Sequence, residues 1–483
     1  MELRDRVTKG VTWSIAEKVA SALLQMVVSI VVARMLAPQD FGTVAILVFF
    51  TAVASVVVDS GFSQTLIRKS RVSNDDFRSV FIFNITFAAV VYVALVATSP
   101  AVARFYELPI IRHIAPVIFL VIPFAALGAV QSAVMARNFQ FAAISQINFA
   151  ASFVSGVAAI ALALCGCHVW SLVWQRLLYV AVRSLLLWYG SSWRGEGRVS
   201  LNLLRDMAPF SLRLMATDTV AAVYANISQM FIGKIYSPTL LGYFNQGQKL
   251  KDLPVNALVQ SVQSVTYPAL SNIADNREKF AESYRVVLLA TAAIVMPIMV
   301  GMIAVADDMF VVLLGERWLP TVPYFRILAL GGVCYPLSMV AMNVLKVYSN
   351  GSIIIRLEIV KKVVMTLIFA ITIPLSAEAV AWGLTAILFI ELVMNIAASL
   401  RYVALGIVAV VRTLLTVATV TAVMYLAVVV VGELISHFTP IWRLLIEILT
   451  GIATYAGVAL LFRTEFFRVL SENALRLLRP KNG

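Results

Sequence analysis

The chain has 483 residues and a formal net charge of +13; 61% of its residues are hydrophobic and only 13% are charged. A soluble protein of this length needs a charged surface, which this composition does not provide. Apolar runs of about 20 residues recur along the chain, and each can cross the roughly 30 Å hydrocarbon core of a bilayer. The composition therefore excludes a soluble globular protein and predicts an all-α, polytopic membrane protein.

The hydropathy pattern predicts fourteen membrane-spanning helices with short connections and no inserted soluble domain. We expect the N-terminal stretch to be the first membrane helix and not a cleaved signal peptide, because Glu17 and Lys18 interrupt its apolar run. Three cysteines are too few for a disulfide framework and metal ligands do not cluster, so we expect no cofactor and no metal site. The predicted ranges are 11–33, 41–62, 78–99, 112–136, 141–164, 168–190, 207–232, 241–268, 282–306, 322–345, 353–374, 379–401, 411–432 and 441–462.

The distribution of Lys and Arg predicts the orientation of these helices. With both termini in the cytoplasm, the inside segments hold 23 Lys and Arg residues and the outside segments hold seven. This is the positive-inside bias of membrane proteins, so the net charge reports topology and not nucleic-acid binding. The tail 463–483 has an apolar helical face flanked by arginines, and we expect it to lie on the anionic inner leaflet.

Two ten-residue stretches about 200 positions apart follow one plan. ARMLAPQDFG covers 33–42 and GKIYSPTLLG covers 233–242, and each joins one predicted helix to the next on the outer side. Proline stops a helix and glycine permits a tight reversal, so each stretch predicts a sharp turn. The matching positions are Arg34 and Lys234, Pro38 and Pro238, and Gly42 and Gly242.

The repeat predicts two lobes. An even number of predicted helices separates the copies, so both halves have the same orientation, related by an axis along the membrane normal. We therefore expect two parallel six-helix lobes around a central cavity, followed by two C-terminal helices. The predicted parts are the N-terminal lobe 1–190, a cytoplasmic linker 191–206, the C-terminal lobe 207–403, the last two helices 404–462 and the tail 463–483.

A row of polar residues follows one face of the predicted helix 241–268. Its members are Asn245, Lys249, Asp252, Asn256, Gln260 and Gln263, with Gln248 and Lys251 flanking it. Their spacings of three and four place them along one side of a helix, and such a face cannot lie against lipid. The row either makes hydrogen bonds to neighbouring helices or lines a water-filled cavity, and its length favours the cavity.

Charged residues also occur in the predicted helices 11–33 and 207–232, which the repeat aligns. The first carries Glu17 and Lys18, and the second carries Arg213 and Asp218. The four form an ion-pair gate between the lobes, or the two cations bind an anionic head group. In the second case Glu17 or Asp218 is available for coupling to an ion gradient, and Asp252 on the next helix is a further candidate for that role.

Other charges lie within predicted spans. We interpret Asp59 as a local helix cap or partner, and Glu358 and Lys362 as an intrahelical pair. Arg176 and Arg183 lie about two turns apart and are candidates to line a cavity. The polar lining of the expected cavity comes mainly from the second half of the chain, and a long apolar surface lies beside it. That combination suits an amphiphile with a charged head and a hydrophobic tail.

Four stretches resemble the polysaccharide flippase family of the multidrug/oligosaccharidyl-lipid/polysaccharide exporter superfamily. KGVTWSIAEKVASALLQMVVSIVVARMLAPQDFGTVAI at 9–46 is followed by DSGFSQTLIRK at 59–69. In the second half, ISQMFIGKIYSPTLLGYFNQGQKLKDLPVN at 227–256 is followed by VTYPALSNI at 265–273. The similarity is to the branch of colanic-acid exporter-like lipopolysaccharide biosynthesis proteins, and it extends over most of the chain.

The resemblance implies a flippase of the bacterial inner membrane that works by alternating access. Its substrate would be an undecaprenyl-pyrophosphate-linked oligosaccharide, an O-antigen, exopolysaccharide or capsule repeat unit, carried from the cytoplasmic to the periplasmic leaflet. Its partners would be membrane lipids, a polysaccharide polymerase with the export machinery, and a proton or sodium ion. The candidates for the diphosphate are Lys18, Arg213, Lys249 and Lys251, and those for the sugars are Asn245, Gln248, Asn256 and Gln260.

Two other functions compete with this interpretation. A membrane polysaccharide polymerase or ligase would need acid and base groups in large outer loops. The longest predicted outer segment, 306–321, offers only Asp307, Asp308, Glu316 and Arg317, so we expect no enzyme. A drug/cation antiporter of the same fold would favour acidic residues in the cavity, whereas the polar row is rich in amides and lysines.

Overall fold

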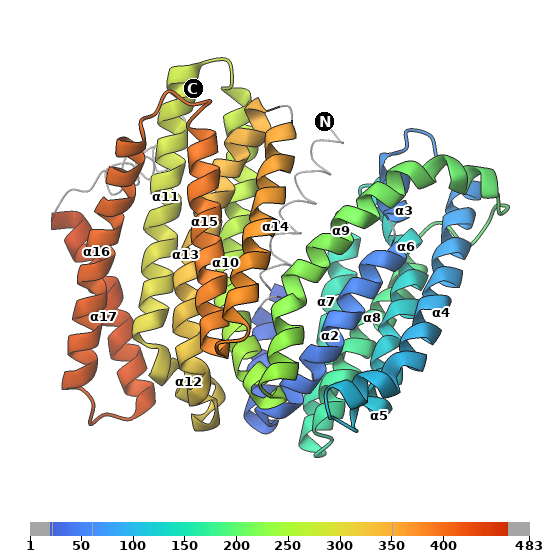
Figure 1. Cartoon of the computed structure of the whole chain (residues 1–483), viewed down its shortest axis with the longest axis horizontal. Coiled ribbons are helices and arrows are strands. Elements are labelled where there is room, and N and C mark those ends of the chain that lie inside the picture. Colours follow the sequence, from blue (N-terminus) through green and yellow to red (C-terminus); the bar gives the residue numbers. More distant parts are fainter. Residues whose placement is uncertain (1–19, 22, 60, 350, 462–483) are drawn as a thin grey trace, which may run out of the picture. The chain divides into compact units, whose positions relative to one another are not determined.

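The computed structural model describes residues 20–461 except 22, 60 and 350, and within that part every regular element is a helix (Figure 1). A helix over Leu23–Met35 precedes α2. The remaining helices are α2 Pro38–Asp59, α3 Phe62–Arg68, α4 Asn74–Phe105, α5 Ile111–Phe119, α6 Val121–Arg137, α7 Phe141–Leu164, α8 Val169–Gly190, α9 Leu201–Ile235, α10 Pro238–Asn272, α11 Arg277–Ala304, α12 Ala306–Leu314, the 3-10 helix η1 Glu316–Thr321, α13 Val322–Tyr348, α14 Ser352–Thr372, α15 Ala377–Ser399, α16 Ile407–Leu434 and α17 Pro440–Leu461.

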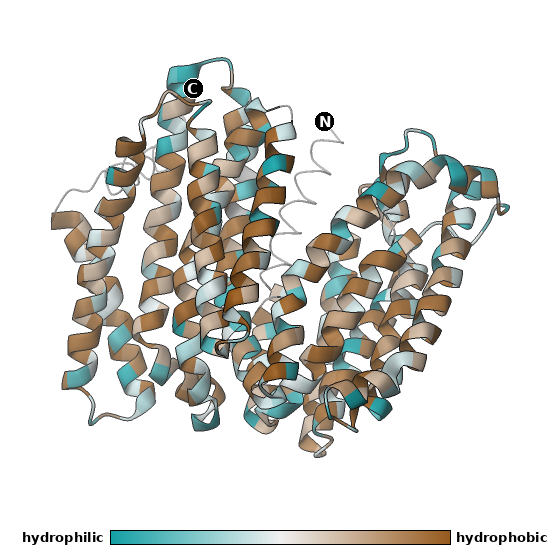
Figure 2. Cartoon of the chain, viewed as in Figure 1, coloured by the Kyte–Doolittle hydropathy of each residue, from teal (hydrophilic) through white to brown (hydrophobic). Residues whose placement is uncertain are grey.

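These helices confirm an all-α membrane protein. Within the described chain, nine helical segments are long and apolar enough to cross a bilayer by themselves. The long helices outside that set are α8, α9, α10 and α14, and each of them carries two or more charged residues. Figure 2 shows hydrophobic residues along the middle of the helices and hydrophilic residues gathered at their ends and connections.

Three local features differ from the predicted ranges. The predicted helix 112–136 is divided at Leu120 into α5 and α6. The short helix α3 occupies residues predicted as the end of a span and the following loop. The predicted outer segment 306–321 is itself helical, as α12 and η1.

The described chain divides into two compact units, one ending at Asn245 and the other beginning at Gln246, so α10 contributes to both. The predicted lobes 1–190 and 207–403 follow the internal repeat, and their boundaries remain a prediction. In the first unit α9 packs against α2, α3 and α4, and α6 and α7 pack against α8.

The segment that connects α8 to α9 is docked on α4 of the first unit. The indole of Trp193 is buried, with the residue 4% exposed. Arg78 Nη1 donates a hydrogen bond to the carbonyl of Gly195 at 2.9 Å, and the backbone N–H of Ser200 donates to Ser79 Oγ at 2.9 Å. The predicted linker is therefore held against the first unit at Trp193, Gly195 and Ser200.

The two repeated turns lie against each other within the first unit. A Cβ added to Gly42 would collide with the carbonyl of Pro238, and one added to Gly242 would collide with the carbonyl of Pro38. The contact is reciprocal, because each glycine receives the proline carbonyl of the other copy. Glycine is required at both positions because only a residue without Cβ permits so close a backbone approach.

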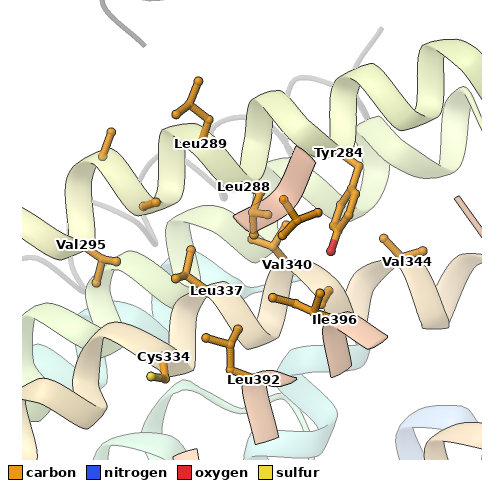
Figure 3. Packing of buried hydrophobic residues seen from close by; sticks show 14 of the residues in the cluster. Tyr284, Leu288, Leu289, Val295, Cys334, Leu337, Val340, Val344, Leu392 and Ile396 are labelled. Atoms are coloured by element: carbon orange, nitrogen blue, oxygen red, sulfur yellow. The ribbon is translucent and has the colours of Figure 1, made fainter. Parts of the chain in front are cut away.

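The second unit has an apolar core centred on α13, which packs against α11 and α15. Figure 3 shows Leu288 from α11, Leu337 and Val340 from α13, and Leu392 and Ile396 from α15 pointing toward one another. Burial of a Leu or Ile side chain contributes about 1.5–3 kcal/mol. The α16–α17 hairpin joins this unit through contacts of α16 with α11 and of α17 with α12.

Candidate functional site

A pocket of about 490 Å³ lies among α2, α3 and α9 of the first unit. Three alanines of α9 form one wall, and their short side chains leave the space open. Two carboxylates and one amide supply its polarity. The lining residues are Val56, Asp59, Gly61, Gln64, Asp218, Ala221, Ala222 and Ala225.

The turn between α2 and α3 shapes this pocket. Gly61 has a φ of 68°, in the left-handed region that glycine tolerates, and a Cβ there would lie 3.0 Å from the Ser211 carbonyl oxygen of α9. Ser63 Oγ donates a hydrogen bond to Asp59 Oδ1 at 2.6 Å. The predicted local partner of Asp59 is thus Ser63, and the carboxylate lines the pocket as well. The hydroxyl groups of Thr65 and Ser211, 2.8 Å apart, join α3 to α9.

Cationic groups lie on the same two helices. The Arg68 guanidinium lies 4.4 Å from the centre of the Phe210 ring. Arg213 is exposed, and its guanidinium has no ion-pair partner among the described residues. Asp218 is half-buried in the pocket wall. Glu17 and Lys18, the predicted counterparts on the first helix, lie outside the described residues.

The predicted polar face of α10 is accessible along most of its length. Lys249, Asn256 and Gln260 are exposed, and Asn245 and Asp252 are half-buried. Gln248 and Gln263 are half-buried too. The Oε1 of Gln248 is shielded from solvent without a hydrogen-bond partner in the described chain. An exposed amide and lysine row of this kind offers hydrogen-bond donors and acceptors to a polar ligand.

Lys251 differs from the rest of the α10 candidates because it is buried, with 8% of the residue exposed. Its Nζ lies 2.6 Å from Asp252 Oδ1. Its aliphatic stem packs at Gly332 of α13, where an added Cβ would lie 3.3 Å from Lys251 Cδ. The ammonium is thus already neutralised within the second unit.

A second ion-pair group lies on α14 and α15. Lys361 Nζ lies 2.9 Å from Glu358 and 3.1 Å from Glu391. Glu358 therefore forms an ion pair with Lys361, three residues later in the chain. Lys361 also connects α14 to the next helix, α15. The phenol of Tyr335 on α13 lies within electrostatic range of both ion-pair groups, including Asp252.

Two arginines of α8 were candidates to line a cavity. Arg183 Nε donates a hydrogen bond to Asn148 Oδ1 of α7 at 2.9 Å, so it joins two helices. Arg176 is exposed. Over the described residues, no three His, Cys, Asp or Glu side chains are arranged to hold a metal ion.

Sequence reasoning missed the pocket, and Gln64 in particular. The residue lies in DSGFSQTLIRK, where the apolar positions Phe62, Leu66 and Ile67 follow a helical spacing that indicates a short helix. The three small residues of α9 gave no signal, because alanine is common in any membrane helix.

The fold, with nine described helical segments long and apolar enough to cross a bilayer, defines a multi-pass membrane protein that has polar surfaces among its helices. Residues 31–323 match the polysaccharide biosynthesis protein family, which is more than half of the chain. The chain therefore belongs to that family.

Individual relatives agree with this assignment. The succinoglycan biosynthesis transport protein ExoT of Rhizobium meliloti (strain 1021) is 23% identical over 361 residues, covering 74% of this chain and 73% of that protein. The lipopolysaccharide biosynthesis protein WzxC of Escherichia coli (strain K12) is 25% identical over 347 residues, covering 69% and 68%. The structure of the lipid II flippase MurJ in an inward closed conformation has a TM-score of 0.74 at 16% identity, over 95% of this chain and 99% of that chain. The last likeness establishes the fold.

Proposed function

We propose that this transporter moves an undecaprenyl-pyrophosphate-linked oligosaccharide from the cytoplasmic to the periplasmic leaflet of a bacterial inner membrane, with both termini in the cytoplasm. The glycan is an O-antigen, exopolysaccharide or capsule repeat unit. The observation that carries the proposal is the α10 face, where Lys249, Asn256 and Gln260 are exposed on a helix of membrane-spanning length. Family membership and the named activities of ExoT, WzxC and MurJ support the substrate class.

The diphosphate is the main obstacle to crossing. Moving an ion of carboxylate size from water into a medium of low dielectric costs on the order of 20 kcal/mol in the ideal case, and several kcal/mol after relaxation. Lys18, Arg213 and Lys249 are the proposed cations that offset this charge. Lys251 is a weaker candidate for direct contact, because its ammonium is paired with Asp252.

The oligosaccharide requires hydrogen-bonding groups and little charge. Asn245, Gln248, Asn256 and Gln260 of α10 are the proposed sugar contacts. The unpartnered Oε1 of Gln248 is an acceptor that a sugar hydroxyl can satisfy. The prenyl chain stays in the lipid, so only the head group has to pass through polar surroundings.

Alternating access then carries the head group across, with the two lobes of the repeat rocking against each other. Glu17, Asp218 and Asp252 are the proposed gate or coupling groups, for a proton or a sodium ion. When a proton or a sodium ion binds to a carboxylate between cations, the net charge at that site changes. Such a change can favour one conformation of the protein over another. A polysaccharide polymerase and the export machinery would take the product.

One observation favours a second candidate, a drug/cation antiporter. The pocket of the first unit contains the carboxylates Asp59 and Asp218, and acidic groups attract a cationic substrate. The α10 face carries the opposite charge and favours an anion. The two candidates therefore predict different substrates for different surfaces of this chain.

The deciding experiment uses a deletion strain of the source bacterium. Its lipids are extracted, and prenyl-diphosphate oligosaccharides are identified by mass spectrometry. Complementation compares the wild type with Arg213→Ala and Lys249→Ala. The matched controls are Arg112→Ala and Lys279→Ala, which remove exposed cations at the ends of other helices.

We expect completed lipid-linked units to accumulate on the cytoplasmic side and to clear with the wild type and both controls. The two test variants should clear them at least tenfold more slowly, which corresponds to about 1.4 kcal/mol. If no unit accumulates and the strain instead becomes sensitive to cationic drugs, the antiporter is correct. If units accumulate on the periplasmic side without polymerising, the flippase proposal fails.

A further inference from the structure

The α16–α17 hairpin contains a buried acidic side chain to which the proposed transport assigns no role. Glu447 of α17 is 6% exposed, and its Oε2 has no hydrogen-bond partner in the described chain. Its other oxygen faces the α16 backbone, where a Cβ on Gly432 would lie 2.5 Å from Glu447 Oε1. An ionised carboxylate in this position would be both desolvated and unpaired, which is strongly unfavourable.

The neighbouring charges do not neutralise Glu447. Arg443, one turn earlier on α17, is held by Asp308 of α12, with Nη2 and Nε at 2.7 and 2.8 Å from Oδ2. Asp307 is held by Arg326 of α13 at 2.6 Å. Each arginine of the cluster is committed to one aspartate, and the carboxylate of Glu447 is left over.

Among the described residues, the other helices packed on α17 also offer Glu447 Oε2 no hydrogen-bond partner. On the α16 side, Glu447 Oε1 faces Gly432, which has no side chain that could donate a hydrogen bond. From α11 the Ala293 carbonyl accepts a hydrogen bond from Tyr455, at 2.8 Å and two turns further along α17. The charged groups close to Glu447 are Asp308, Arg443 and Asp307, so acidic groups outnumber basic ones.

We propose that Glu447 is a proton-binding site that fastens the α16–α17 hairpin to the second unit. A proton from the aqueous phase binds at Oε2 and makes the carboxyl group neutral while α17 is docked on α12 and α16. Loss of that proton leaves a buried anion beside Asp308, and the hairpin loosens. A proton fits better than a metal ion, because the described acidic side chains do not converge as metal ligands.

Glu447 lies two turns from the start of α17 at Pro440, so water reaches the cluster when that helix end opens. With the predicted orientation this end faces the periplasm. The hairpin would then respond to the acidity outside the cytoplasmic membrane. The inference stands on the hairpin alone and does not depend on which lipid is transported.

The test measures thermal unfolding of the purified full-length protein between about pH 5 and pH 9. The folded state holds a proton that the unfolded state releases, so stability falls as pH rises. Between the pKa of this carboxyl group in the unfolded state and its pKa in the folded state, the unfolding equilibrium constant of the wild type should rise up to tenfold for each pH unit, and above the folded-state pKa it should level off. Glu447→Gln keeps the shape of the neutral acid, and this contribution to the slope should disappear.

Two variants of the same hairpin serve as controls. Glu433→Gln removes an exposed acid next to Gly432, and His437→Gln removes the exposed histidine near the hairpin tip, a residue type that titrates near neutral pH. Both should keep the slope of the wild type. Hydrogen exchange of residues 407–461 should accelerate at high pH in the wild type, beyond the intrinsic chemical effect, and not in Glu447→Gln.

A third variant tests the charge balance. Asp308→Asn frees Arg443 to pair with Glu447, and the dependence on pH should shrink. If Glu447→Gln has the same slope and the same hairpin exchange as the wild type, Glu447 holds no proton and the proposal is wrong. If sodium chloride, but not choline chloride, restores stability at high pH, the site binds sodium instead, and the proton assignment is also wrong.

Discussion

The turn before α2 and the turn before α10 have the same backbone plan but opposite capping chemistry. In the first, the backbone N–H of Ala37 donates to Asp40 Oδ2 at 3.2 Å. In the second, the backbone N–H of Leu240 donates to Ser237 Oγ at 3.1 Å. These are the two reciprocal halves of one capping box. Either half satisfies an otherwise unpaired N–H, so the cap can vary while the glycine cannot.

The second turn is also braced by the end of α4, within the same unit. Lys234 Nζ lies 3.0 Å from Glu107 Oε1 and 5.1 Å from the centre of the Phe105 ring. The hydroxyl of Tyr106 donates to the carbonyl of Met230 at 3.2 Å. Burial raises the pKa of Tyr106 to about 12, so this donor keeps its proton throughout the physiological range. Both turns therefore require the close backbone contact, whereas the hydrogen bonds and ion pairs that support them differ from one turn to the other.

Substitutions at the contact between the two turns should have the largest effect on stability. Gly42→Ala and Gly242→Ala each place a methyl group against a backbone carbonyl, which cannot rotate away as a side chain can. We expect each to lower the free energy of unfolding by about 1–3 kcal/mol. Thermal unfolding of the purified protein measures this loss. The control is Gly457→Ala, a helical glycine with no atom within 4 Å of an added Cβ, which should be neutral or stabilising.

The double variant tests whether the two turns are one contact. Gly42 and Gly242 lie against each other, so Gly42→Ala with Gly242→Ala should cost less than the sum of the single variants. A backbone shift that accommodates one methyl group also makes room for the other. Strict additivity in the double-mutant cycle would show that the turns respond independently.

The cap of the second turn should have an intermediate effect. Ser237→Ala removes the acceptor of the Leu240 N–H, and we expect a loss of about 1 kcal/mol. Ser237→Thr keeps the oxygen and should recover most of it. In the first turn, Asp40→Ala should cost a similar amount and Asp40→Asn much less. Equal stability of Ser237→Ala and the wild type would mean that water replaces the cap.

The ion pair of the second turn should have the smallest effect. Glu107 is 82% exposed on its side chain, so solvent screens its attraction to Lys234. Lys234→Gln should cost about 0.2–1 kcal/mol, with a double-mutant cycle against Glu107→Gln giving the pair energy. That energy should fall further at high salt. A pair energy above about 1 kcal/mol would contradict this expectation and would mean that the ion pair makes a larger contribution to the stability of the turn.

Several features of the fold were predictable because they depend on local sequence. Apolar length predicts membrane helices, so long helices cover most of the predicted spans. Proline followed by glycine predicts the two turns at Pro38 and Pro238, whatever packs around them. A helical spacing of polar residues predicts that Lys249, Asn256 and Gln260 share one accessible face of α10.

Other features required contacts between distant residues. The break of the predicted helix 112–136 at Leu120 does have a local signal, because Pro123 has no N–H to donate to the carbonyl of Phe119, and the predicted range did not use it. Lys251 lies on the same helix as Lys249. Its side chain is buried against Gly332 and paired with Asp252, so it is not part of the accessible face. The pocket depends on Ala221 and Ala222 lying opposite Asp59, a distance of about 160 residues along the chain.

By itself the sequence determined the class of the protein, the helices and the repeat, because membrane insertion and turn formation depend on short runs of neighbouring residues. Only the tertiary structure decided which charges remain free. Arg213, Lys251 and Glu447 are equally plausible as isolated charges within membrane helices. Packing leaves the first exposed, gives the second a partner and buries the third without one. The free energy of a charge in a membrane depends on its nearest solvent and counter-charge, and these come from residues far away in the chain.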